Sequence, residues 1–166
     1  MQTEIKIHPA QQVDIPAVQE IVQITWPATY LKIIGQEQLD YMLQLFYSTE
    51  ALLHQMKQGH KFIIAKQGNL ILAFAAYNQE EEKVWKLQKL YALPNTQGKG
   101  IGKMLVDYII HDLKNNHAVW LKLNVNRHNS AKIFYEKLGF KVVSEEDIEI
   151  GNGYFMNDYV MQKNVE

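Results

Sequence analysis

Residues 94–103 read PNTQGKGIGK, with three glycines at alternate positions. A predicted strand at residues 84–93 comes directly before this stretch, and a predicted helix at residues 103–115 follows it. Small residues let the backbone come close to a ligand, and the N–H groups at the start of a helix attract anions. Lys99 and Lys103 add positive charge. The turn is therefore a candidate cradle for a diphosphate group.

Two better-known phosphate-binding motifs do not fit this turn. A Walker P-loop would need Gly at the position of Gln97 and Ser or Thr at that of Met104. The dinucleotide fingerprint G-x-G-x-x-G also fails, because the glycines fall at Gly98, Gly100 and Gly102. Taken alone, the stretch could equally be a plain turn that uses glycine only for its φ angles.

Hydrophobic periodicity predicts the elements on either side of the turn. Extended segments are expected at residues 3–8, 61–66, 70–77, 84–93, 119–125, 140–150 and 154–162. Helical stretches are expected at residues 15–26, 37–46, 49–58, 103–115 and 130–138. Pro27 should end or kink the first of these helices. The order β-α-α-β-β-β-α-β-α-β-β predicts an α+β fold, in which helices flank a mixed, largely antiparallel sheet, and not a doubly wound fold.

Length and composition fit an ordinary globular protein. The 166 residues are expected to form one domain over residues 1–166, and hydrophobic residues make up 47% of them. A net charge of -1 and a single arginine, Arg127, argue against nucleic-acid binding. The absence of Cys excludes a disulfide framework, a zinc–thiolate site and a Cys nucleophile. No apolar run approaches the ~20 residues of a membrane span, so no membrane association and a cytoplasmic location are expected.

Two motifs together resemble the signatures of the GNAT superfamily of acetyl-CoA-dependent N-acetyltransferases. The first is Q-x-x-G-x-G, at Gln97, Gly100 and Gly102, directly after a predicted strand. The second is NSAKIFYEKLGF at residues 129–140, where an Asn opens a short helix. The two motifs stand in the family's order, separated by a helix and a strand. The likeness covers about residues 60–162 and implies the GNAT fold and acetyl-CoA as cosubstrate.

The resemblance also implies where coenzyme A binds. In the family, the strand before the turn and the strand after the long helix splay apart, and pantetheine adds to the first strand like a further strand. Carried over, this gives main-chain contacts from Tyr91, Ala92 and Leu93, although ordinary strand packing also accounts for them. Asn129 is expected to be both a helix cap and a coenzyme contact, with His128 as the alternative. The diphosphate is assigned to Gln97, Gly98, Lys99, Gly100, Ile101 and Gly102.

One catalytic residue follows from the resemblance. Tyr135 matches the family's tyrosine near the coenzyme sulfur, where a phenol of pKa ~10 can protonate the departing thiolate. The alternative is that Tyr135 only fills core space at helical spacing from Ala131 and Leu138. Gln88 stands about where many members carry a Glu and cannot usefully accept a proton. Three routes stay open for the amine's proton: a base elsewhere, a water relay, or an acceptor that arrives neutral.

The acceptor is expected to be a primary amine, acetylated directly in a ternary complex, because no Cys is present for a covalent relay. In the family, the first helical region and the last hairpin flank the acceptor mouth. Trp26, Tyr30 and Tyr154 are therefore predicted to bind it, and with the acid Asp158 they suit a small cationic amine, such as a polyamine or an amino-acid derivative. Alternatively, the aromatic residues of the first region simply pack helices on the sheet.

Other functions stay open from the sequence. The acceptor could be a protein N-terminus or lysine, the acyl group could differ from acetyl, or the domain could bind coenzyme A as a sensor without turnover. The six His residues lack metal-ligand spacing, so no metal site is predicted. A homodimer is conceivable through the C-terminal hairpin.

Overall fold

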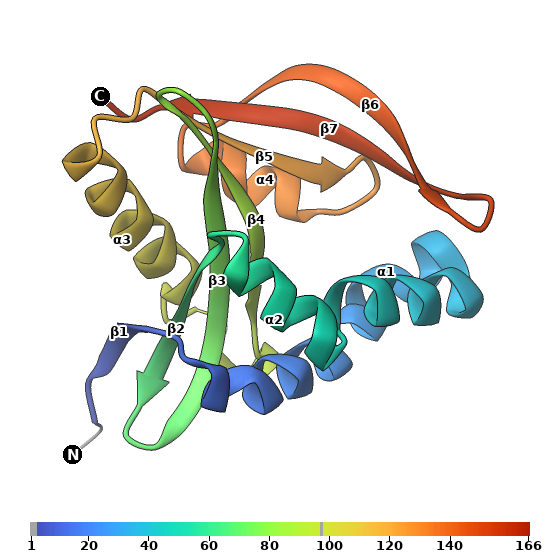
Figure 1. Cartoon of the computed structure of the whole chain (residues 1–166), viewed down its shortest axis with the longest axis horizontal. Coiled ribbons are helices and arrows are strands. Elements are labelled where there is room, and N and C mark those ends of the chain that lie inside the picture. The colour runs from blue at the N-terminus through green and yellow to red at the C-terminus, as the bar shows by residue number, and fades with distance from the viewer. Residues whose placement is uncertain (1–2, 97) are drawn as a thin grey trace.

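The computed structural model describes residues 3–96 and 98–166 and contains a seven-stranded sheet of order β1-β2-β3-β4-β5-β7-β6 (Figure 1). Its strands are β1 (Ile5–Pro9), β2 (Lys61–Gln67), β3 (Leu70–Glu81), β4 (Val84–Ala92), β5 (Trp120–Asn126), β6 (Lys141–Gly151) and β7 (Tyr154–Asn164). Its α-helices are α1 (Ile15–Tyr47), α2 (Thr49–Lys57), α3 (Ile101–Asn115) and α4 (Ala131–Lys137). Two 3₁₀ turns, η1 (Gln12–Asp14) and η2 (Pro94–Thr96), precede α1 and follow β4. Every strand pair is antiparallel except β4 with β5, which confirms the predicted α+β fold.

Helices cover both faces of the sheet, with α3 on one side and α1 and α2 on the other (Figure 1). On α3 the buried residues Ile101, Leu105 and Ile109 recur every four positions, so one helix face packs into a core beneath the sheet. A second core forms on the opposite face, where α1 contributes Ile21 and Trp26. Strands covered on both faces therefore read as continuous apolar runs, as β3 does.

The first helix is longer than predicted. Of the two outcomes expected at Pro27, an end or a kink, the end is wrong, because α1 continues past it and its non-helical backbone lies at Gly35 (φ 80°). Trp26 packs against Tyr30 in the following turn and against Tyr47 at the end of α1. This packing on both sides of the proline outweighs the loss of one backbone hydrogen bond. A glycine at the break is expected, because a positive φ is costly for other residues.

Gln88 is an extra residue in β4. Tyr77 of β3 pairs with Leu87, and the residue before Tyr77, Ala76, pairs with Lys89. Gln88 therefore has no counterpart on β3. Such a β-bulge reverses which side chains face each side of the strand. Leu87 accordingly belongs to the core beneath α3, whereas Tyr91 packs in the core beneath α1.

Strands β4 and β5 diverge at the bulge. Their parallel pairing covers only four residues on each strand and ends where Leu87 meets Leu123. Beyond this point the edge of β4 that faces β5 has no neighbouring strand. The splay expected between these two strands is thus present, and it lies at the centre of the sheet.

The β6–β7 hairpin crosses the second half of α1 (Figure 1). The Tyr41 hydroxyl donates to the carbonyl of Ile150 at 2.7 Å, and the Gln38 amide donates to the carbonyl of Phe155 at 2.8 Å. These bonds hold the hairpin over the side of the splay that faces α1. No helix in the described ranges 3–96 and 98–166 is long and apolar enough to cross a membrane.

Candidate active site

A cleft follows the splay between β4 and β5. Residues 87–92 of β4 form one wall, and residues 123–125 of β5 form the other. Asn129, Ala131 and Tyr135 close it from the start and middle of α4, and α1 adds Tyr30. An extended ligand in this cleft would meet the unpaired edge of β4, where backbone N–H and C=O groups can hydrogen-bond as they would to another strand.

The glycine turn lies at one end of β4 and leads into α3. Gly98 and Gly100 have positive φ angles of 82° and 70°, which side-chain-bearing residues rarely adopt. The N–H of Met104 is the first in α3 to reach back within the helix, to Gly100, so the preceding N–H groups lie ahead of the helical ladder. Gln97 lies outside the described residues. The arrangement fits an anion such as a diphosphate.

Gly102 has a different role from its neighbours. A Cβ atom at this position would lie 2.9 Å from the ring of Phe134, which is closer than real Cβ contacts. A Cβ at Gly100 or Gly98 would meet nothing within 4 Å. The glycine at 102 is therefore required by the packing of α3 against α4, whereas the other two meet the conformational demands of the turn.

Three polar side chains connect the cleft to α1. The hydroxyls of Tyr30 and Tyr91 share a hydrogen bond of 2.9 Å, and the Asn129 amide donates to Tyr30 at 3.4 Å. The other end of the Asn129 side chain accepts from the N–H of Ala131, the first residue of α4, at 2.9 Å, and Ser130 stands between them at the N-cap position. Burial raises the pKa of both tyrosines, which therefore keep their protons at neutral pH.

Tyr135 packs in the core and also lines the cleft. Its ring stacks on Phe134 at 5.1 Å, meets Phe140 edge-on at 5.7 Å, and is 9% exposed. Burial raises its pKa above the ordinary value, with a further contribution from Tyr30. The two interpretations of this residue are compatible, since one buried phenol can fill space and hold a proton beside the cleft.

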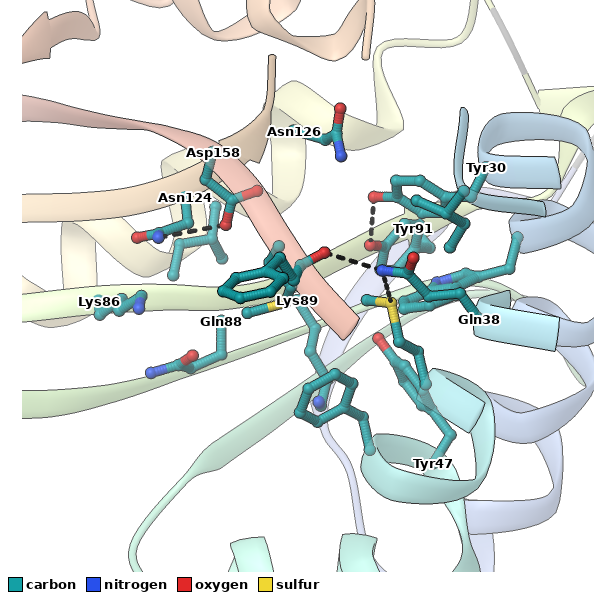
Figure 2. Close-up of a pocket in the computed structure, with 17 residues that line it drawn as sticks. Tyr30, Gln38, Tyr47, Lys86, Gln88, Lys89, Tyr91, Asn124, Asn126 and Asp158 are labelled. Atoms are coloured by element: carbon teal, nitrogen blue, oxygen red, sulfur yellow. Dashed lines mark hydrogen bonds between the residues drawn. The ribbon is translucent and has the colours of Figure 1, made fainter. Parts of the chain in front are cut away.

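A second pocket lies on the α1 side of the splay, beneath the β6–β7 hairpin (Figure 2). The two spaces meet, because six residues line both of them: Tyr30, Leu87, Gln88, Lys89, Tyr91 and Asn124. Trp26 and Tyr30, two of the residues predicted to bind the acceptor, line it. Tyr154 is not part of its wall and packs against Tyr41 instead, with ring centroids 5.3 Å apart. The hairpin supplies Phe155, Met156 and Asp158.

Asp158 is the one acidic side chain in the wall of this pocket. It lies on β7, is 6% exposed, and accepts a hydrogen bond of 3.3 Å from the Asn124 amide (Figure 2). Burial raises the pKa of its carboxyl, and the hydrogen bond and two cations, Lys86 and Arg127, partly offset the rise. A carboxylate of raised pKa in a pocket can attract an amine and accept its proton.

Lys89 is a pocket residue that the sequence does not single out. Its side chain runs from β4 towards Tyr47, with the ammonium 4.4 Å from that ring's centroid (Figure 2). Burial lowers its pKa to about 8. A regular alternation along residues 84–93 would place it with Leu87 on the α3 face, and only the bulge at Gln88 turns it into the pocket.

No group of three or more His, Cys, Asp or Glu side chains within the described parts of the chain could hold a metal ion.

Comparison with known proteins agrees with this geometry. A family profile described as Acetyltransferase (GNAT) domain matches residues 30–162. Spermidine N(1)-acetyltransferase of Thermoplasma acidophilum is 26% identical over 92% of this chain and 92% of its own. The crystal structure of PaiA N-acetyltransferase from Thermoplasma acidophilum in complex with coenzyme A superposes with a TM-score of 0.82 at 26% identity, covering 97% of this chain and 99% of that one.

A shorter match is more similar in sequence. [Ribosomal protein bS18]-alanine N-acetyltransferase of Haemophilus influenzae is 32% identical over 59% of this chain. This match covers 64% of the Haemophilus protein's own length.

Proposed function

The chain belongs to the GNAT acetyltransferase family and is an acetyl-CoA-dependent N-acyltransferase, and from that premise we propose that it passes acetyl directly to a primary amine while both substrates are bound. The observation that carries this proposal is the meeting of two pockets, one on each side of the splay, at Tyr30, Tyr91 and Asn124. Substrates that enter from opposite sides can react there without a covalent enzyme intermediate, and holding both in place supplies much of the rate enhancement.

The coenzyme half is assigned to the cleft. We assign the pantetheine to the main chain of Tyr91, Ala92 and Leu93, and the diphosphate to the turn from Gln97 to Gly102, with Lys99 as an added cation. The unpaired edge of β4 and the positive φ angles of the turn support this assignment. Asn129 lies beside both α1 and the cleft and can contact the coenzyme through the amide that now meets Tyr30.

In the proposed reaction, one bond forms and one breaks at the thioester carbonyl carbon, and protons move at the attacking nitrogen and at the departing sulfur. The amine nitrogen attacks the carbonyl carbon, the C–N bond forms, and the C–S bond breaks. Tyr135 donates its proton to the departing thiolate as the C–S bond breaks. Burial raises the pKa of the phenol, which keeps it protonated at neutral pH but also makes it a weaker acid. A cationic acceptor first gives one proton to solvent and attacks as the neutral amine. The second proton lost by the nitrogen goes to Asp158, directly or through water, and solvent restores the proton of Tyr135. Gln88, which hydrogen-bonds to Asn78, takes no part in proton transfer.

The proposed acceptor is a small amine that is cationic in solution. Asp158 provides the negative charge that attracts it, and Trp26 and Tyr30 provide aromatic faces. The hairpin is bonded to α1 through Tyr41 and Gln38 over this pocket, which favours a small molecule over a folded protein as the acceptor. A relative that matches nearly the whole chain is named for acetylating spermidine, a small cationic amine.

A panel of amines tests the proposal. The protein is incubated with acetyl-CoA and polyamines, amino acids, alkylamines, aminoglycosides or peptides, and both thiol release and the acetylated product are measured. We expect amine-dependent thiol release with a matching acetylated small amine. Turnover confined to peptides would reject the small-amine acceptor, and coenzyme binding without any turnover would indicate a sensor domain.

A further inference from the structure

Lys89 is a buried cation with no partner. Its side chain is 9% exposed, and it makes no hydrogen bond or ion pair with any described residue. An ammonium has three N–H donors and normally meets acceptors or water for all of them. The other lysine in the pocket wall, Lys86, has an acidic partner, Glu80, at 3.8 Å. Lys89 therefore differs from its neighbour in having a charge that the protein itself does not balance.

Two aromatic rings lie near the Lys89 ammonium but offer its N–H groups no hydrogen-bond acceptor. The ring of Tyr47 lies 4.4 Å from the nitrogen and the ring of Phe46 lies 5.8 Å from it. A cation–π contact contributes attraction but leaves the N–H groups without acceptors. Burying a charge without a counter-ion is costly, and an apolar residue would pack in this core without that cost. A ligand anion that reaches the ammonium would remove the imbalance.

The pocket thus has opposite charges at its two ends. Asp158 lies on β7 near the splay, and the Lys89 ammonium lies deeper, beside Tyr47 (Figure 2). The rest of the wall mixes apolar side chains, such as Ile34 and Met42 of α1, with polar ones and with Lys86, which is paired with Glu80. A complementary ligand has an ammonium at one end, an anion at the other, and an apolar body.

We propose that Lys89 binds a carboxylate of the acceptor, so that the acceptor class is amino acids and related amino-carboxylic acids, with the amine at Asp158 and the carboxylate at Lys89. This inference rests on the proposed function, in which the pocket holds the acceptor. It narrows that function, because a polyamine would place a second cation against Lys89, and like charges repel.

Matched substrates and variants test the inference. The ω-amino acids from 4-aminobutanoate to 8-aminooctanoate are compared with alkylamines of the same carbon number, since a series of lengths needs no assumption about the spacing. The variants are Lys89→Met, which keeps the apolar stem, Lys89→Arg, which keeps the charge, and Lys66→Met on β2, outside both pockets.

In the wild type, kcat/KM for the best amino acid should exceed that for its alkylamine by roughly 10-fold or more, as for a charge-assisted hydrogen bond. Lys89→Met should remove this preference by raising KM for the amino acid, Lys89→Arg should keep part of it, and Lys66→Met should keep all of it. A preference that survives in Lys89→Met overturns the inference. So does an equal fall in kcat for both substrates, which would make Lys89 a proton acceptor.

A binding measurement separates this inference from the proposed function. Calorimetry follows hexanoate binding to the coenzyme A-saturated protein, without any turnover. Hexanoate that binds the wild type at least about 10-fold more tightly than Lys89→Met supports the anion site even if no amine is acetylated. Equal or absent binding in both, together with acetylation of alkylamines, rejects the anion site and leaves the acetyltransferase standing.

Discussion

Tyr135 is buried and also lines the cleft wall. A substitution can therefore remove its acidic proton and leave the packing of its ring unchanged. Tyr135→Phe keeps the ring that stacks on Phe134 and removes only the hydroxyl. We expect kcat to fall by ~10²–10⁴-fold, with little change in KM for acetyl-CoA, because general acid catalysis acts in the transition state. Steady-state kinetics at neutral pH provide the measurement. A rate within about twofold of the wild type would show that Tyr135 serves packing alone.

Asp158 should set the acid limb of the pH–rate profile. A base must be deprotonated to act, so activity rises with pH through the pKa of Asp158, which burial raises above that of an ordinary carboxyl. The surrounding charges, Lys86, Arg127 and Glu146, shift that pKa further in both directions. Asp158→Asn should lower kcat/KM and abolish the limb. A limb that persists unchanged in this variant would assign it to another group.

Lys89 should lower the stability of the protein at neutral pH. Its pKa falls from 10.5 in the unfolded chain to about 8 in the fold, so the folded state holds the charge at a cost. Between these pH values the unfolded chain binds more protons, and the stability of the wild type rises with pH. The free energy of unfolding of Lys89→Met at pH 7 should therefore exceed that of the wild type by about 1–3 kcal/mol.

Urea denaturation at several pH values checks this expectation, with Lys66→Met on β2 as the control outside both pockets. The advantage of Lys89→Met should shrink as the pH rises from about 8 towards 10.5, because the wild-type lysine then becomes neutral. An advantage that is constant with pH would attribute the gain to the apolar side chain and not to the buried charge.

At the scale of elements, the glycines that connect β4 to α3 divide into two kinds. Gly102→Val would press a branched side chain into the ring of Phe134, so this ring, which packs against Tyr135 on α4, would have to shift. Overpacking of this kind typically costs about 1–3 kcal/mol. Gly100→Val meets no atoms but needs a positive φ, and it places a side chain in the turn assigned to the diphosphate.

The two glycine variants should therefore fail differently. We expect Gly102→Val to lower the melting temperature clearly, whereas Gly100→Val should stay folded and lose most of its affinity for coenzyme A. Thermal unfolding and calorimetry measure the two effects. Unchanged coenzyme A affinity in a folded Gly100→Val protein would contradict the role of the turn.

The elements themselves are largely predictable from the sequence. Period-2 and helical patterns place α3, α4 and the strands within a few residues of their observed ends, because each of these elements buries one regular set of side chains. Two features break that regularity. α1 continues past Pro27 because aromatic packing on both sides compensates the lost bond, and the bulge at Gln88 reverses the alternation of β4. Both depend on contacts distant in sequence.

At the scale of the whole molecule, those two irregular features shape the proposed reaction site. The bulge ends the pairing of β4 with β5 and turns Lys89 and Tyr91 towards α1, while the extended α1 brings Tyr30 to meet them. The coenzyme side follows from sequence motifs, because its contacts are local to a turn and a short helix. The acceptor side joins α1, β4 and the β6–β7 hairpin, so the sequence predicts Trp26 and Tyr30 there but not Lys89.

Because the two pockets meet, we predict that both substrates are bound when acetyl is transferred. Initial velocities measured over a grid of acetyl-CoA and amine concentrations test this claim most directly. Double-reciprocal plots should give lines that intersect, as for a ternary complex. Parallel lines, the pattern of a reaction through an acetylated enzyme, would contradict direct transfer across the splay between β4 and β5.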